Sequence, residues 1–269
     1  MAAVETALRQ ARAAGRPSLV TYVTGGIRED WTDLLGAMIE AGADAVEIGL
    51  PFSDPMLDGR TIQEASAAAI SRGASTAGIL GQLSAAAASD VPLIAMTYAN
   101  HAYSGGLHAF CRQLADAGLS GVIIPDLPAV EAGDYLEAAG QAGLDATLMV
   151  TPATGQEQIK AIAGRTRGFL YVMSVMATTG NPHESADTAR WAVAARARRH
   201  SPRPVLIGFG IDTPAGRWPR PGTPTASSSP PRWCAAYWTA PAAPASAATW
   251  PPCVPRSTRP AREHGPADG

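Results

Sequence analysis

The chain has 269 residues and a formal net charge of −2, and 46% of its residues are hydrophobic against 16% that are charged. This balance excludes a chain that is disordered throughout and gives no basic surface for nucleic acid. No apolar run approaches the roughly 18 residues of a membrane span, and the N-terminal region lacks the apolar centre of a secretory signal. Three scattered cysteines exclude a disulfide framework and a dense metal site. We therefore expect a cytoplasmic protein with no membrane segment and no bound metal.

Seven short apolar runs predict strands that are buried on both faces. They are Ser18–Val23, Ala45–Ile48, Leu93–Thr97, Gly121–Ile124, Ala146–Val150, Phe169–Met173 and Pro204–Ile207. Amphipathic stretches lie between them, and the stretch Trp31–Ile39 repeats its apolar residues at helical spacing. Gly42, Gly118 and Gly143 each stand directly before one of the runs, where a helix is expected to end in the left-handed conformation. The pattern predicts seven strand–helix units.

The composition changes sharply at residue 216. Residues 216–269 hold 12 of the 23 prolines and four of the six tryptophans, and they contain no Leu, Ile, Met, Phe or Lys. We expect a disordered tail rich in Pro, Ala and Ser, because the segment offers no periodic apolar face. Read one base out of register, GC-rich codons from Arg217 onward can encode V-A-A-A-G-H-A-D-G-V-V-V, a helix end followed by an apolar strand. We interpret the tail as a frameshift product that replaces a final strand and helix.

The repeated units predict an α/β fold with parallel strands, either an open doubly wound sheet or a (β/α)8 TIM barrel. The first run is not followed by G-x-G-x-x-G, which argues against a dinucleotide-binding sheet. Seven strands and the eighth in the shifted frame favour the barrel, with residues 1–215 as its domain and 216–269 as the tail. In the encoded frame the last strand–helix unit is missing or replaced. We therefore expect an open barrel whose first and seventh strands are unpaired edges.

Glu47 stands inside a continuous apolar run, and burying a carboxylate there is costly unless it is paired. No other predicted strand carries a basic residue that could pair with it. Burial raises the pKa of a carboxylic acid, which suits a general acid or base at neutral pH. In a TIM barrel the active site lies at the carboxyl ends of the strands, where Glu47 is predicted to be. The sequence thus predicts that Glu47 is functional.

The loop after this strand carries two further acids, Asp54 and Asp58. Each alone is typical of a turn, because Asp54 precedes a proline and Asp58 precedes a glycine. Later loops carry features suited to an anion: Thr179 and Gly180 after the sixth strand, and Gly210 after the seventh. Glycine lets backbone N–H groups approach an anion, and phosphate sites in barrels use the late loops. A phosphorylated substrate is expected.

A long segment that begins at Glu47 reads E-I-G-L-P-F-S-D-P-M-L-D-G-R-T-I-Q. M-T-Y-A-N, I-I-P-D-L-P, L-Y-V-M-S, T-T-G and G-F-G-I follow it in order. Together they resemble the tryptophan synthase alpha subunit family, over about Val4–Pro214. The resemblance implies a (β/α)8 barrel that cleaves indole-3-glycerol phosphate to indole and glyceraldehyde 3-phosphate. It also implies an alpha2beta2 complex in which the beta subunit carries pyridoxal phosphate and joins indole to serine, and no cofactor in this chain.

The same resemblance implies roles for individual residues. The two catalytic carboxylates of the family match Glu47 and Asp58 and imply a retro-aldol reaction. Asp58 then accepts a hydrogen bond from the indole N–H and stabilises the positive charge that forms when indole C3 is protonated. Glu47 moves protons at C3 and at the glycerol hydroxyl. The positions that match substrate-binding residues are Tyr98, Tyr171, Thr179, Gly180, Phe209 and Gly210.

Two alternatives stay open: a lyase that acts without a beta subunit, and a catalytically impaired chain that only binds and activates one. Phosphoribosylanthranilate isomerase shares the architecture but lacks the segment E-I-G-x-P-F-S-D-P. His101, His108 and His183 are interpreted as solvated or structural, and Asp126 as a turn residue. Tyr98 and Tyr171 could equally be aromatic core residues with satisfied hydroxyls.

Overall fold

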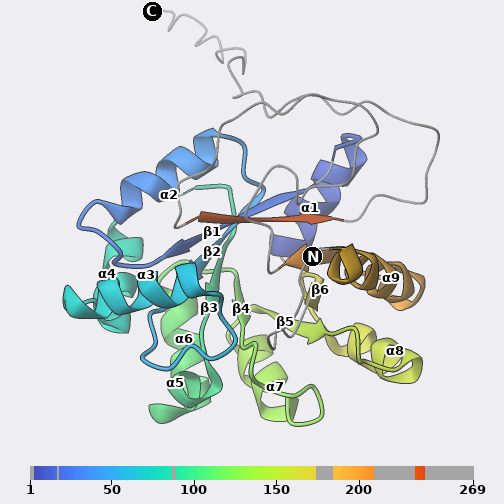
Figure 1. The fold of residues 1–269 in the computed structure, drawn as a ribbon. Helices are drawn as coiled ribbons and strands as arrows, with labels where there is room; N and C mark the ends of the chain where they lie inside the picture. The colour runs from blue at the N-terminus through green and yellow to red at the C-terminus, as the bar shows by residue number, and fades with distance from the viewer. Residues whose placement is uncertain (1–2, 17, 87–88, 174–183, 209–233, 240–269) are drawn as a thin grey trace, which may run out of the picture.

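The computed structural model describes residues 3–16, 18–86, 89–173, 184–208 and 234–239, with residues 184–191 and 234–239 described by their backbone alone. Within this part of the chain the strands form a closed barrel, β1 to β8, in which each strand neighbours the next in sequence. Helices α2 to α9 follow one another around the barrel in chain order (Figure 1). None of the described helices combines the length and the apolar character that a membrane span requires.

The first seven strands are parallel, and the ends of each lie within one residue of the predicted run. They are β1 (Leu19–Thr24), β2 (Ala45–Gly49), β3 (Leu93–Met96), β4 (Gly121–Ile123), β5 (Asp145–Val150), β6 (Leu170–Met173) and β7 (Val205–Gly208). Their apolar residues are buried on both faces, as parallel strands covered by helices require. The predicted (β/α)8 barrel is confirmed for these seven strands.

The predicted helix over Trp31–Ile39 is confirmed as α2 (Trp31–Glu40). Gly42, Gly118 and Gly143 have φ angles of +96°, +84° and +75°, so the predicted left-handed helix ends are also confirmed. The remaining helices outside the barrel are α3 (Arg60–Ser71), α4 (Thr76–Ala85), α5 (Ala99–Ser104), α6 (Leu107–Asp116), α7 (Gly133–Gln141), α8 (Gln156–Arg165) and α9 (Glu184–His200).

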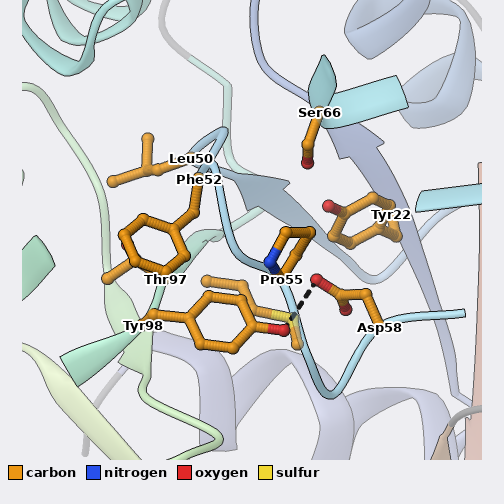
Figure 2. Close-up of a pocket in the computed structure, with 9 residues that line it drawn as sticks. Tyr22, Leu50, Phe52, Pro55, Asp58, Ser66, Thr97 and Tyr98 are labelled. Carbon is orange, nitrogen blue, oxygen red and sulfur yellow. Dashed lines mark hydrogen bonds between the residues drawn. The ribbon is translucent and has the colours of Figure 1, made fainter. Parts of the chain in front are cut away.

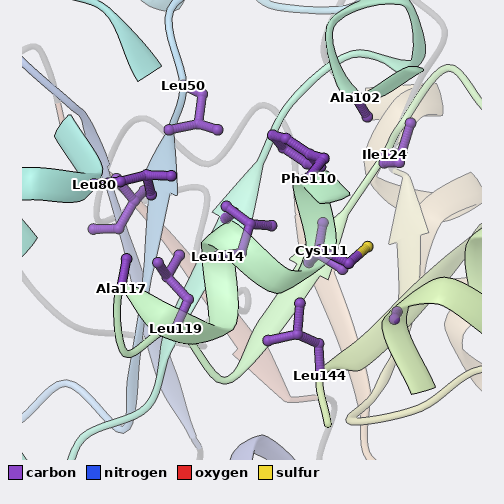
Figure 3. Packing of buried hydrophobic residues seen from close by; sticks show 14 of the residues in the cluster. Leu50, Leu80, Ala102, Phe110, Cys111, Leu114, Ala117, Leu119, Ile124 and Leu144 are labelled. Atoms are coloured by element: carbon purple, nitrogen blue, oxygen red, sulfur yellow. The ribbon is translucent and has the colours of Figure 1, made fainter. Parts of the chain in front are cut away.

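The core has two layers, one inside the barrel and one between the strands and the helices. The inner cluster includes Tyr22, Met96 and Tyr171. In the outer layer, Phe110 and Leu114 of α6 are packed in one cluster with residues of the neighbouring strands and helices (Figure 3). Because side chains alternate along a strand, each residue of β1 to β7 belongs to one layer or the other.

The two ends of the barrel differ. We call the end at which β1 to β7 finish the mouth, and the opposite end the floor. Helix α1 (Ala3–Ala13) covers the floor, because its Val4 and Leu8 pack into the inner cluster and Val4 lies beside Gly121, the first residue of β4. Asp145, the first residue of β5, accepts hydrogen bonds from the backbone of Glu5 and Val4 at the start of α1.

The expectation of an open barrel is wrong. Strand β8 (Cys234–Thr239) pairs with both β1 and β7, and it runs antiparallel to each of them. Residues 234–239, which belong to the segment expected to be a disordered tail, form this strand. A strand at this position satisfies the backbone groups of both edges, which explains why the gap is filled without the expected sequence pattern. The predicted domain boundary at residue 215 and the rest of the tail lie outside the described residues.

Candidate active site

Glu47 lies inside the barrel. Ala45 packs in the inner cluster, whereas Val46 and Ile48 pack against the helices, so alternation places Glu47 on the inner face of β2. Its side chain is 0% exposed. The strand register places Glu47 opposite Tyr22 of β1. The predicted burial of this carboxyl group is confirmed.

Asp58 comes to the mouth from the loop between β2 and α3, and it lines a cavity with Tyr22, Met96 and Tyr98 (Figure 2). Burial raises the pKa of Asp58 from 3.8 to about 6. The hydrogen bond from Tyr98 lowers the pKa but does not cancel the effect of burial. Asp58 Oδ2 accepts that bond at 3.0 Å. Asp58 Oδ1 is buried and has no hydrogen-bond partner among the residues that the structure describes. At pH 7 the group is mostly ionised and can accept one more hydrogen bond.

Tyr98 lies two residues after the end of β3 and points from there toward the loop that carries Asp58 (Figure 2). Its hydroxyl group donates to Asp58 Oδ2 and accepts a hydrogen bond from the backbone N–H of Leu57 at 3.1 Å. One phenol therefore contacts two consecutive residues of the loop. Burial, and then the charge of Asp58, raise the pKa of Tyr98, so its hydroxyl remains protonated and able to donate.

Tyr22 is close in the fold to both acids, although its sequence context gave no sign of this. It is opposite Glu47 in the strand register and lines the cavity with Asp58. Burial raises the pKa of Tyr22, and the charges of Asp58 and Glu47 raise it further. The hydroxyl group occupies the space over Gly49, where a Cβ atom would lie only 1.9 Å from it. Tyr22 therefore fits only because residue 49 is a glycine. This relation depends on how β1 is aligned beside β2, so it is not visible in the sequence.

A stack of aromatic rings supports Tyr98 from the side. Phe52 stacks on Tyr98 with ring centroids 5.1 Å apart, and the His101 ring lies 6.4 Å from Phe52. The two ring nitrogens of His101 hydrogen-bond the hydroxyl groups of Thr76 and Thr97, at 2.7 and 3.2 Å. These contacts agree with a structural role for His101, and burial lowers its pKa.

The structure places the other predicted site residues as follows. Tyr171 is buried in the inner cluster beside Phe169, but it does not line the cavity that contains Asp58. Asp126 accepts a hydrogen bond from the backbone N–H of Ala99 at 2.8 Å and so caps the start of α5, which is more than a turn role. Four predicted phosphate-site or substrate-binding positions lie outside the described residues: Thr179, Gly180, Phe209 and Gly210.

The arrangement combines a buried acid inside the barrel with a second acid that is mostly ionised at neutral pH. Leu50, Phe52 and Met96 give the cavity apolar walls. Asp58 can accept a hydrogen bond from a group that enters this cavity, whereas Glu47 is not among the residues that line it. Among the described residues, no group of three His, Cys, Asp or Glu side chains is placed to hold a metal ion.

Comparison with known proteins agrees with this geometry. A family model described as tryptophan synthase alpha chain matches residues 8–216, up to the point where the composition changes. The alpha chain of Phenylobacterium zucineum (strain HLK1) is 42% identical over 205 residues, which are 74% of this chain and 73% of that protein. A solved tryptophan synthase from M. tuberculosis in its aminoacrylate-bound form has a TM-score of 0.70 at 30% identity, covering 79% of this chain and 82% of that one. The chain therefore belongs to the tryptophan synthase alpha chain family.

Proposed function

We propose that this chain cleaves indole-3-glycerol phosphate to indole and glyceraldehyde 3-phosphate, in tryptophan biosynthesis, by a retro-aldol reaction at the mouth of the barrel. One observation carries the proposal: Tyr22 lies opposite Glu47 in the strand register and lines a cavity with Asp58, one oxygen of which has no partner among the described residues. Membership of a family of lyases supports the same reaction.

Asp58 acts on the indole ring. The reaction requires a proton on C3, and this places positive charge on the ring nitrogen. Asp58 Oδ1 accepts the N–H hydrogen bond, so the ionised carboxylate stabilises that charge as it forms. Tyr98 occupies Oδ2, which leaves Oδ1 as the acceptor for the ring.

Glu47 moves the protons. As the acid it gives its proton to indole C3, and as the base it then takes the proton of the glycerol hydroxyl next to the breaking bond. The bond between C3 and the glycerol carbon breaks, its electron pair restores the aromatic ring, and the hydroxyl carbon becomes the aldehyde. One proton leaves Glu47 and one returns, so the residue ends in its starting state.

The chain is also proposed to bind a tryptophan synthase beta subunit and to pass indole to it. A relative of known structure, from Pyrococcus furiosus, is described as a tryptophan synthase complex; it has a TM-score of 0.62 at 29% identity. In this chain Met56 is 78% exposed in the loop that also carries Asp58, a position from which a bound protein could influence the site. Co-purification with a beta chain tests this partner, and turnover that is unchanged when one is added favours the lyase that acts alone.

The proposed reaction is tested by measuring indole release by the full chain. Glu47→Gln and Asp58→Asn are each expected to lower the rate by about 10²–10⁴-fold, because each removes an acid–base or charge-stabilising group. Glu64→Gln, on the exposed face of α3, is the matched control. Near-normal turnover in both site variants would refute the assignment.

A second protein belongs in the same assay: the chain with the one-base shift from Arg217 onward reversed. If the tail is a frameshift product, the restored chain is expected to release indole faster, because it regains a parallel eighth strand and the phosphate contacts after it. No release from either protein, with beta-subunit activation intact, would instead establish the chain that only binds.

A further inference from the structure

Asp58 depends on few contacts for its position. It belongs to a loop outside the helices and strands, and nearby Met56 is largely exposed. Two side chains from outside this loop bind its end, one from α3 and one from the residue that precedes α5. Gln63 of α3 donates to the backbone carbonyl of Asp58 at 2.9 Å, whereas Tyr98 hydrogen-bonds the carboxylate itself. Only the second contact reaches the group that is proposed to meet the substrate.

Tyr98 is well placed to hold this carboxylate. It lies two residues after β3, and Asp126 from the loop after β4 accepts a hydrogen bond from the N–H of the next residue, Ala99. Phe52 stacks on one side of its ring, and His101 holds Phe52 in turn. Because the ring is fixed by these contacts, its hydroxyl group has a defined position from which to donate.

We propose that Tyr98 is a positioning residue that orients the Asp58 carboxylate by bridging its Oδ2 atom to the backbone N–H of Leu57. The inference rests on the proposed function only for the role of Asp58 in the reaction. The bridge occupies Oδ2 and leaves Oδ1 without a partner among the described residues, and its hydrogen bond to the ionised form opposes the effect of burial on the pKa of Asp58.

The consequence can be measured directly on Asp58. Burial raises the pKa of Asp58 to about 6 despite the hydrogen bond from Tyr98, which lowers it. Tyr98→Phe keeps the ring and its stack on Phe52 but removes the donor. The pKa of Asp58 is therefore expected to rise by about one unit in this variant, since hydrogen bonds to charged groups are among the stronger ones.

The test is carboxyl-carbon NMR titration of the full chain with ¹³C-labelled aspartate, in which Asp58→Asn identifies the resonance. Gln63→Met is the matched control, because it removes a contact to the same loop without touching the carboxylate. Tyr22→Phe is a second control, because this phenol lines the same cavity but its hydroxyl accepts from Thr24 instead. Both controls are expected to leave the pKa of Asp58 close to its wild-type value. An unchanged value in Tyr98→Phe, or an equal rise in Gln63→Met, overturns the proposal.

A second substitution covers the case in which Tyr98→Phe does not fold. 3-Fluorotyrosine at position 98 keeps every contact but makes the phenol a stronger donor, so the pKa of Asp58 is expected to fall; no change overturns the proposal. The titration needs no turnover and therefore tests the inference separately from the proposed function. Where the chain releases indole, the acid limb of kcat/KM is expected to move to higher pH in Tyr98→Phe. A loss of equal size at every pH would show a structural role instead.

Discussion

The barrel holds a buried aspartate at each end, and the two are stabilised in different ways. At the floor, burial raises the pKa of Asp145, but hydrogen bonds from the backbone of Glu5 and Val4 and the charge of Arg203 lower it. At the mouth, a hydrogen bond from the side chain of Tyr98 lowers the pKa of Asp58 against the effect of burial. The floor acid is thus matched to fixed backbone groups at the start of a helix, where a carboxylate is favoured.

This difference separates a structural acid from a functional one. Asp145 links the start of α1 to the start of β5 at the floor of the barrel. Each acid keeps one buried oxygen, Oδ1 of Asp58 and Oδ2 of Asp145, that has no hydrogen-bond partner among the described residues, and burial leaves the pKa of each above its ordinary value. Asp58 differs in its place, because it lines the cavity at the mouth, where an acceptor without a partner can meet a substrate, whereas Asp145 does not line that cavity.

The comparison predicts that removing the mouth acid stabilises the protein at neutral pH. The pKa of Asp58 is raised in the folded state, so its favourable contribution is complete below about pH 3.8 and is lost as the pH rises through about 6. Asp58→Asn has no charge to bury. Its free energy of unfolding is expected to exceed that of the wild type by at most about 3 kcal/mol at pH 7–8, with the difference shrinking toward pH 5.

Urea unfolding at several pH values between 5 and 8 checks this prediction. Asp116→Asn, an exposed position on α6, is the control and is expected to show no such trend. If Asp58→Asn is no more stable than the wild type at pH 8, the carboxylate is not destabilised where it lies and the contrast with Asp145 fails.

The packing of the mouth can be broken at Gly49. A methyl group there would lie 1.9 Å from the hydroxyl oxygen of Tyr22 and 2.5 Å from the ring carbon that bears it. Gly49→Ala is therefore expected to cost about 1–3 kcal/mol of stability, as other overpacked cores do. In a Tyr22→Leu background the same change is expected to cost much less.

Thermal or urea unfolding of the two single variants and the double variant gives this coupling. Gly36→Ala in α2 is the matched control, since nothing lies near its added methyl group, and it is expected to be neutral or slightly stabilising. Equal costs for Gly49→Ala with and without Tyr22 would show that the two residues do not compete for space.

The smallest expected change in stability comes from a substitution at the floor. Asp145→Ala removes the acceptor for the first N–H groups of α1 and is expected to cost about 1–2 kcal/mol of stability. Indole release per folded molecule is expected to stay unchanged, because Asp145 lies at the opposite end of the barrel from Asp58. Asp134→Ala, an exposed acid in the first turn of α7, is the control. A specific loss of turnover in Asp145→Ala, with stability retained, would contradict the assignment of the two ends.

Much of the fold could be predicted because its signals are local. Runs of apolar residues mark strands buried on both faces, and a glycine at a helix end, such as Gly42, marks a backbone conformation that other residues rarely adopt. Strand β8 could not be predicted. Its six residues follow no helix or strand pattern, and they are held by the open edges of β1 and β7, which lie far away in the sequence.

The candidate site likewise has one part that the sequence could identify and another part that depends on the folded structure. Glu47 could be identified because a carboxyl group in an apolar run conflicts with its surroundings, a conflict visible in one strand alone. The roles of Tyr22 and Tyr98 depend on which strand lies beside which and in what register. The link from His101 through Phe52 to Tyr98 depends on contacts between α5 and the loop after β2. Such relations exist only once the barrel has formed.

The reversed direction of β8 changes how the end of the chain is routed. Because β8 is antiparallel to β7, the end of β7 and the start of β8 both lie at the mouth. A parallel last strand must start from the floor, so it needs a crossover, usually a helix, before it can pair. The polarity of this one strand therefore decides which end of the barrel the chain reaches at the end of β8. It is the floor here, whereas in a fully parallel barrel it is the mouth, where an eighth loop can meet a substrate phosphate.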